Sequence, residues 1–154
     1  MPILRIGHTP DADDAFMYYA IAHGKVPIGK FQVQHVLEDI ETLNQRALVG
    51  ELEGTAISAA AYPQVAHKYR IMRVGSSIGR NYGPMVVALA ERPDVHIEGA
   101  RIAIPGEYTT AYMLLRLYAE GFDAVPMAFD SIVSAVQEGQ VDAGLLIHEG
   151  QVTY

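Results

Sequence analysis

The sequence predicts an α/β protein with two lobes. Short β-rich runs alternate with segments of helical period along nearly the whole chain of 154 residues, which is typical of sheets built from βαβ units. One polar stretch with proline and glycine, residues 92–99, interrupts this pattern. We therefore expect a first α/β lobe over residues 1–91, a linker over 92–99 and a second, smaller lobe over 100–154. Two lobes joined by a short hinge form a cleft, where small ligands usually bind.

Three strands, each followed by a helix, are expected in the first lobe. Asp39 has the residue type of a helix N-cap and Gly50 that of a helix stop, so a helix is expected between them. Glycine at position 24 ends an earlier helix, whose apolar side chains recur at helical spacing. The expected strands are residues 3–7, 31–38 and 55–58, and the third is followed by a helix of small residues over 59–69.

The second lobe repeats the alternation in a shorter form. Its expected strands are residues 101–106, 124–129 and 142–147, and its expected helices are 109–121 and 130–139. Neither internal repeats nor low-complexity segments are evident.

Composition excludes several classes of function. The net charge is -7, with 18 acidic and 11 basic residues. The sequence has no cluster of Lys and Arg that could bind the phosphate backbone of a nucleic acid, so nucleic acid is not an expected partner. The absence of cysteine excludes disulfides and thiolate metal sites. No apolar run approaches the ~20 residues that span a bilayer, and the N-terminus lacks a secretory pattern. We expect a cytoplasmic protein that binds a small molecule and no membrane.

His148 is the first candidate site residue. It follows the last expected strand, at the carboxyl end where open α/β sheets bind ligands. A histidine there can act as a general base near neutral pH, and Glu149 beside it can orient the imidazole. The alternative is a loop histidine that only caps the strand.

Thr109 and Thr110 are the second candidates, at the start of an expected helix. Exposed amide groups and a hydroxyl at such a start favour a carboxylate or another anion. The alternative is helix capping alone, since threonine is a common cap.

Ser58 is the third candidate, at the end of an expected strand and before a run of alanines that lets a ligand approach the backbone. No partner histidine stands at a fixed spacing, so the sequence favours a hydrogen-bonding role over a nucleophilic one.

The fourth candidate is the group Asp11, Asp13 and Asp14 at the start of the first helix. Carboxylates there complement the helix dipole, which is the favoured account. Calcium is the alternative, but the run lacks the later glycine and glutamate of an EF-hand loop, so no metal site is expected.

Several motifs together resemble the menaquinone-biosynthesis family of the futalosine route, and within it the 1,4-dihydroxy-6-naphthoate synthases. They are P-D-A-D-D-A-F-M-Y-Y-A-I-A-H-G, V-L-E-D-I-E-T-L-N, S-A-A-A-Y-P-Q-V, G-P-M-V-V-A, I-P-G-E-Y-T-T-A-Y-M-L-L and L-L-I-H-E-G-Q-V-T-Y. The resemblance implies a two-lobed fold similar to periplasmic solute-binding proteins, with the substrate in the cleft. It also implies a carbon-carbon lyase that opens cyclic dehypoxanthinyl futalosine without a cofactor.

Carried over by residue, the resemblance implies that His148 is the catalytic base. Substrate contacts fall on Ala56, Ile57 and Ser58 and on Thr110 and Ala111. From their positions in the sequence, Thr109, Asp11 and Glu149 are added as secondary site residues. Alternatives are an aromatic-carboxylate binding or sensor protein of the same fold, and the sister activity chorismate dehydratase.

The chain also departs from the family pattern. The usual S-P-C-P-N-D-T-F entry is T-P-D-A-D-D-A-F, which adds negative charge, and Ala56 stands where many members carry lysine. Relatives continue past the H-E-G segment, so the chain resembles a fragment, truncated at its C-terminus. A fragment exposes sheet edges, and a homodimer is one expected way to cover them.

Overall fold

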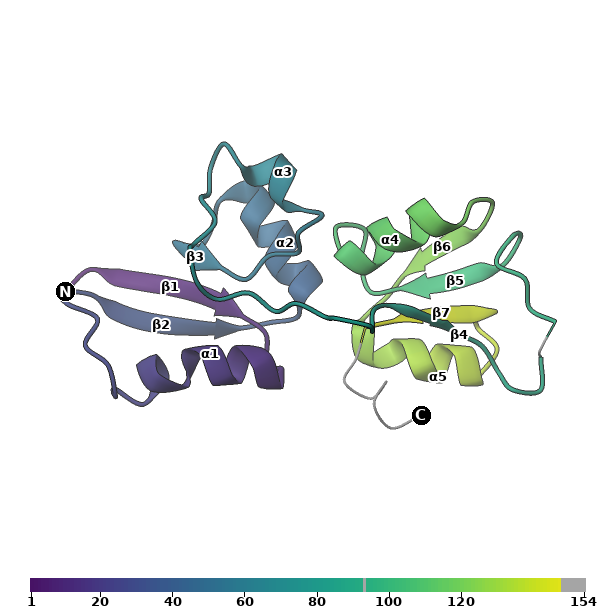
Figure 1. Cartoon of the computed structure of the whole chain (residues 1–154), viewed down its shortest axis with the longest axis horizontal. Coiled ribbons are helices and arrows are strands. Elements are labelled where there is room, and N and C mark those ends of the chain that lie inside the picture. The colour runs from purple at the N-terminus through teal and green to yellow at the C-terminus, as the bar shows by residue number, and fades with distance from the viewer. Residues whose placement is uncertain (93, 148–154) are drawn as a thin grey trace. The chain divides into compact units, whose positions relative to one another are not determined.

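The structure is a computed structural model, and it describes residues 1–92 and 94–147. The chain divides into two compact units, Met1–Ile78 and Gly79–Tyr154, each with its own sheet (Figure 1). No helix in the described residues is long and apolar enough to cross a membrane.

The first unit is a three-stranded parallel sheet with the strand order β2-β1-β3. Helix α1 lies on one face of this sheet and helices α2 and α3 lie on the other (Figure 1). The elements are β1 (Ile3–His8), α1 (Ala12–Ala22), β2 (Gln32–Leu37), α2 (Ile40–Val49), β3 (Gly54–Thr55) and α3 (Tyr62–Val65).

Local signals define the ends of α2. The carboxylate of Asp39 accepts a hydrogen bond from the amide of Thr42 at 3.0 Å, as an N-cap does. Gly50 ends the helix with φ 76°, a left-handed conformation that glycine adopts without steric cost. Both predictions from the sequence are confirmed. The helix buries Leu43 and Ala47 completely.

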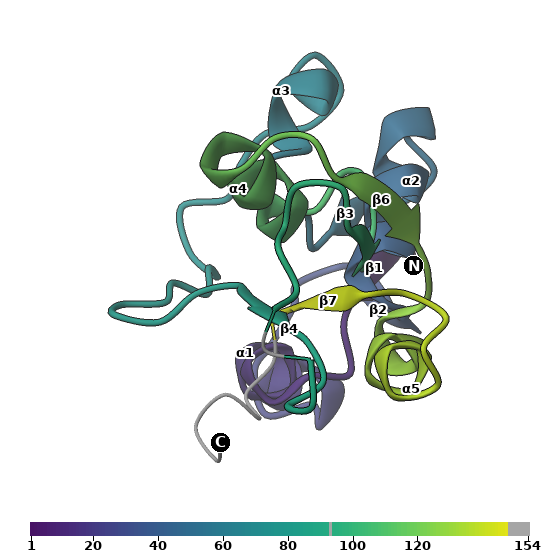
Figure 2. The same cartoon turned by 90° about the vertical axis from the view of Figure 1, so that its right-hand side faces the viewer.

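The second unit is a four-stranded sheet with the order β4-β7-β5-β6, in which β4 alone is antiparallel to its neighbour. Its elements are β4 (Met85–Val87), β5 (Arg101–Ile104), α4 (Thr110–Tyr118), β6 (Asp123–Pro126), the 3₁₀ helix η1 (Phe129–Ser131), α5 (Ile132–Gln137) and β7 (Ala143–Leu146). Helices α4 and α5 cover opposite faces of this sheet (Figure 2).

Two apolar clusters fill the two sides of the second sheet. On one side Ala111 and Leu115 of α4 pack with Ile102 of β5. On the other side Ile132 and Val136 of α5 belong to a cluster with apolar residues of β5 and β7.

Close packing reaches the backbone of β7 at Gly144. A Cβ atom at this position would lie 2.5 Å from Cγ2 of Ile132 and 3.1 Å from Cγ2 of Val136. Helix α5 therefore sits directly against the strand, without a side chain between them.

The boundary between the units differs from the predicted one. It falls between Ile78 and Gly79, whereas the sequence predicted a first lobe that reached residue 91. The reason is that β4 pairs with β7 and so belongs to the second sheet. Val95 and Ile97, in the predicted linker, pack against the second unit's core.

Two predicted elements of the first unit are shorter than expected. Strand β3 ends at Thr55 rather than residue 58, because the amide of Ser58 donates to the side chain of Asn44 instead of to a neighbouring strand. The helix predicted over 59–69 is reduced to α3. After it the amide of Lys68 bonds the carbonyl of Val65 three residues earlier, which closes a turn.

Candidate functional site

All three strands of the first sheet are parallel, so their carboxyl ends meet at one edge. Thr9 follows β1 and Glu38 follows β2 at this edge. The segment 56–58 follows β3, and the amide of Ala56 donates to the carbonyl of Gly7 at 2.7 Å. This hydrogen bond extends the pairing with β1 by one residue beyond β3. The predicted substrate-contact residues, Ala56 to Ser58, therefore lie directly after the end of the strand.

Asn44 of α2 holds Ser58 through both atoms of its amide. Its Nδ2 donates to the hydroxyl of Ser58 at 3.0 Å, and its Oδ1 accepts from the Ser58 amide at 2.9 Å. Asn44 is fully buried, so it fixes the loop from inside the fold. The neighbour of the hydroxyl is thus an amide rather than a base, which fits a hydrogen-bonding role better than a nucleophilic one.

The three aspartates after β1 lie in three different environments. Asp14 is buried and accepts from the amide and the hydroxyl of Thr9, at 2.7 and 3.1 Å, so it fixes the turn. Asp13 is exposed and accepts from the amide of Asp14. Asp11 is the N-cap residue of α1 but makes no side-chain capping bond. Within residues 1–92 and 94–147 no three His, Cys, Asp or Glu side chains form a metal-binding group.

A pair of histidines at this edge was missed in the sequence. His8 ends β1, is buried, and lies with Nε2 2.9 Å from Nδ1 of His35 on β2. The ring of Tyr18, from α1, stacks on His8 with the centroids 4.3 Å apart. Burial, and then the charge of His8, lowers the pKa of His35. Burial, and then the charge of Asp14, raises the pKa of Tyr18.

The strand pattern contained a signal for this pair. In the parallel ladder His35 lies opposite Ile6, and His8 lies two residues after Ile6 on the same face. That signal is readable only when the register of β1 and β2 is known, because a shift of one residue reverses the face.

Thr109 caps α4 in the second unit. It is almost fully buried, accepts from the amide of Tyr112 at 3.3 Å and donates to the carbonyl of Gly106 at 2.8 Å. Its hydroxyl is therefore engaged within the fold, as the capping interpretation expects. Thr110 begins the helix, and Ala111, its second residue, is buried in the core of the second unit.

His148 and Glu149 lie outside the described residues. Strand β7, which they follow, ends at Leu146 and runs parallel to β5. The carboxyl end of β7 and the turn between β5 and α4 therefore lie at the same edge of the second sheet. The structure thus places the helix start of Thr110 and the end of β7 at one edge of the second sheet, and Ser58 at the carboxyl edge of the first sheet.

The sequence profile of the menaquinone biosynthesis family matches residues 4–154. The chain is 47% identical over 154 residues to the 1,4-dihydroxy-6-naphthoate synthase of Thermus thermophilus, covering 100% of this chain and 56% of that protein. It is 38% identical over 159 aligned residues to the synthase of the same name from Streptomyces coelicolor, covering 98% and 55%. The chain therefore spans little more than half the length of these two relatives.

Two solved structures are similar to the chain. A crystal structure of a protein from Archaeoglobus fulgidus is 55% identical, with a TM-score of 0.90, and covers 99% of this chain and 56% of that one. The periplasmic aliphatic sulphonate binding protein of Escherichia coli is 14% identical, with a TM-score of 0.62, over 99% of this chain and 56% of that chain. The second likeness shows the fold alone, and that fold is the solute-binding-protein type predicted from the sequence.

Proposed function

Because the chain belongs to the menaquinone biosynthesis family, we propose that it acts as a 1,4-dihydroxy-6-naphthoate synthase, a carbon-carbon lyase whose substrate is cyclic dehypoxanthinyl futalosine. The observation that carries this proposal is the 47% identity to the Thermus thermophilus synthase over every residue of the chain. The chain spans 56% of that synthase, so the activity is a proposal for this chain and is tested on it below.

His148 is the general base in this proposal. It removes a proton from the substrate, a carbon-carbon bond then breaks, and the naphthoate ring becomes aromatic as the sugar-derived fragment leaves. Glu149 orients the imidazole and raises its basicity. Aromatisation supplies the driving force, so the reaction as written requires neither a metal ion nor a redox cofactor.

In the proposal, residues at the carboxyl edges of the two sheets position the substrate. The hydroxyl oxygen of Ser58 accepts a hydrogen bond from Asn44, so the hydroxyl hydrogen of Ser58 points in another direction. In the proposal Ser58 donates this hydrogen to a polar group of the substrate. The backbone of Ala56 and Ile57 contacts the substrate beside it. Amide groups at the start of α4, at Thr110 and Ala111, bind the substrate carboxylate, as helix N-termini bind anions.

The aspartates at the start of α1 affect where the substrate carboxylate can bind. Asp11 and Asp13 are exposed at the start of α1, and they repel a substrate carboxylate from the first unit's edge. Ala56 supplies no cation there. The proposal therefore assigns the carboxylate to the helix start of the second unit rather than to the edge of the first.

Turnover of cyclic dehypoxanthinyl futalosine by the purified chain, followed by mass spectrometry, tests the proposal. We expect 1,4-dihydroxy-6-naphthoate from the parent and none from His148→Ala. His67→Ala is the matched control, because His67 is exposed in the turn after α3, and it should retain the parent rate.

Absence of product from a chain that unfolds cooperatively would overturn the activity for this chain. Binding of the substrate with equal affinity by the parent and by His148→Gln, again without product, would support a binding protein instead.

A further inference from the structure

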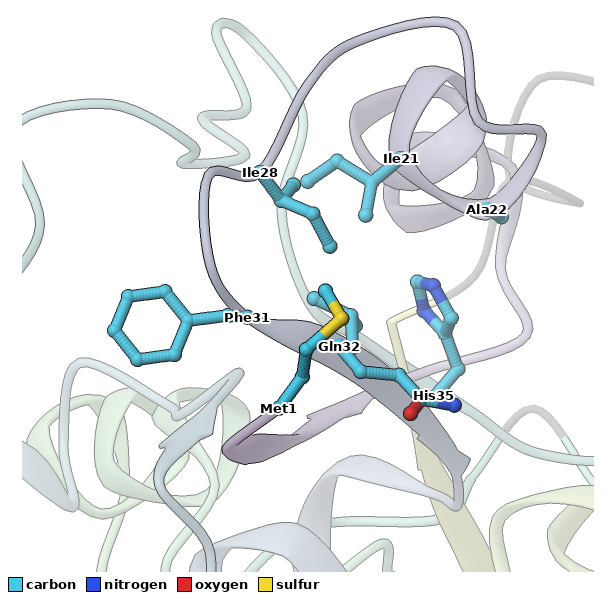
Figure 3. Close-up of a pocket in the computed structure, with 8 residues that line it drawn as sticks. Met1, Ile21, Ala22, Ile28, Phe31, Gln32 and His35 are labelled. Atoms are coloured by element: carbon cyan, nitrogen blue, oxygen red, sulfur yellow. The ribbon is translucent and has the colours of Figure 1, made fainter.

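A pocket of about 320 Å³ lies in the first unit, and His35 of the histidine pair described above is one of its lining residues. It is formed by the end of α1, the loop that follows it and the start of β2. Figure 3 shows the side chains of Ile21, Ile28 and Met1 directed toward one another, with the imidazole of His35 at one end. The volume is at the lower limit for small-molecule sites, which range over roughly 300–1,000 Å³.

The walls of the pocket are mostly apolar. Ile21, Ile28, Phe31 and Val33 contribute hydrocarbon, and no Lys, Arg, Asp or Glu is among the lining residues. An ionised ligand would lose hydration there without an oppositely charged side chain to pair with, so the side chains of the walls favour an uncharged ligand. The imidazole of His35 and the amide of Gln32 are the polar side-chain groups among the lining residues, and either can orient such a ligand.

Hydrogen bonds determine which nitrogen of His35 is protonated. Nδ1 of His8 lies 3.1 Å from the carbonyl of Thr9, which can only accept, so this nitrogen donates. When His8 is neutral, its Nε2 has no hydrogen and accepts from Nδ1 of His35 at 2.9 Å. Neutral His35 then carries its proton on Nδ1, and its Nε2 is an acceptor.

Nε2 of His35 has no hydrogen-bond partner among residues 1–92 and 94–147. A half-buried acceptor beside an apolar wall is stabilised by a ligand that brings a donor. The lowered pKa of His35 keeps the ring neutral, and so an acceptor, at neutral pH.

We propose that this pocket binds a small, uncharged aromatic alcohol whose hydroxyl group donates to Nε2 of His35. A phenolic O–H fits this position because it is more acidic than an aliphatic O–H and donates more strongly to an imidazole. The sulfur of Met1 lies among the apolar side chains, and thioethers make favourable contacts with aromatic rings. The site is separate from Ser58 and from the proposed reaction.

Two matched probes test the proposal on the full chain without a variant. 2-Naphthol carries the donor, and 2-methoxynaphthalene has the same ring system without it. In a two-dimensional ¹⁵N–¹H NMR titration at pH 7.5, 2-naphthol should shift the amide signals of Ile21, Ile28 and Val33. It should bind about tenfold more tightly than the ether, which is the effect of one hydrogen bond. It should also shift the Nε2 resonance of His35.

Two variants locate the binding. His35→Phe removes the acceptor and should make the affinities for the two probes equal, whereas His67→Phe, at an exposed position outside the pocket, should keep the tenfold preference. Ala22→Phe, at an exposed lining position on α1, should weaken the binding of both probes.

Equal affinity of the parent for the two probes would overturn the proposal, as would shifts confined to residues outside the pocket. Retention of the preference by His35→Phe would also overturn it. None of these readouts depends on turnover, so failure here and failure of the proposed lyase activity are distinguishable.

Discussion

The two units bury different kinds of side chain. In the second unit, apolar clusters occupy both faces of the sheet, and Ile102 and Ile132 are fully buried. In the first unit, the described buried residues include His8, Thr9, Asp14 and Asn44, all of which hydrogen-bond near the carboxyl edge of the sheet. Among the described residues, most of the buried apolar side chains therefore lie in the second unit, and four of the five buried polar ones lie in the first.

The strand sequences explain this difference. The middle strands of the second sheet, R-I-A-I and A-G-L-L, are apolar on both faces, as buried parallel strands are. In the first sheet β2 reads Q-V-Q-H-V-L, and its exposed and half-buried positions alternate over the first four residues. A strand of that kind has one face open to polar chemistry.

The largest expected effect is the loss of core packing in the second unit. Ile102→Ala should lower the free energy of unfolding by about 2–5 kcal/mol, because it leaves a cavity between sheet and helix. Urea denaturation measures this change in stability, and hydrogen exchange at the amides of each unit shows which unit is affected. Leu4→Ala, at a half-buried position of β1, is the matched control and should cost less. An equal cost in both strands would contradict the comparison.

Loss of a buried polar anchor in the first unit should rank second. Asn44→Ala removes both hydrogen bonds to Ser58 and should cost about 1–3 kcal/mol. Hydrogen exchange at the Ser58 amide should also become faster. Gln45→Ala, one residue along on the exposed face, is the control and should change neither quantity. Unchanged exchange at Ser58 in Asn44→Ala would show that Asn44 does not hold the loop.

Loss of the Thr109 hydroxyl, which caps α4 in the second unit, should lower stability by less than either of these changes. Thr109→Ala should cost about 1 kcal/mol of stability, because the amide of Tyr112 loses its acceptor. Thermal denaturation measures the change, and Thr109→Ser should restore most of it. A serine variant as unstable as the alanine variant would assign the effect to packing rather than to the cap.

The smallest expected effect is a pH dependence in the first unit. The pKa of His35 in the folded chain lies below its ordinary value of about 6.5. As the pH falls, His35 therefore binds a proton in the unfolded chain before it does so in the folded one. Stability is therefore fully present above that pH and declines as the pH falls below it. His8 from β1 and Tyr18 from α1 are the titratable groups that face this ring.

Melting temperatures of the parent between pH 8 and pH 5 test this expectation. His35→Phe should show a shallower decline, whereas His67→Phe, at an exposed site, should follow the parent. Identical profiles for the parent and His35→Phe would contradict it.

Local signals in the sequence predicted much of the fold. The alternation of strands and helices follows from periodicity, and the caps at Asp39 and Thr109 depend on residues three positions apart. The errors arose where distant segments meet. The domain boundary was misplaced because β4 pairs with β7, nearly sixty residues later. The end of β3 was misplaced because Asn44, 14 residues earlier, takes the amide of Ser58.

The places of the candidate residues in the fold, as distinct from their roles, could be predicted in part for the same reason. Ser58 lies after a strand and Thr110 at a helix start, and both are local features of the sequence. The contact between His8 and His35 spans 27 residues and depends on the register of two strands. No local pattern fixes that register.

Gly144 limits how far the second unit can vary in sequence. The methyl group of alanine would meet a β-branched isoleucine that has little rotamer freedom in a helix, so α5 would have to move away from the sheet. Its φ is not in the left-handed region, so the restriction concerns volume rather than backbone conformation. A library randomised at position 144 and selected for folding should return glycine almost alone, unless position 132 is allowed to shrink with it.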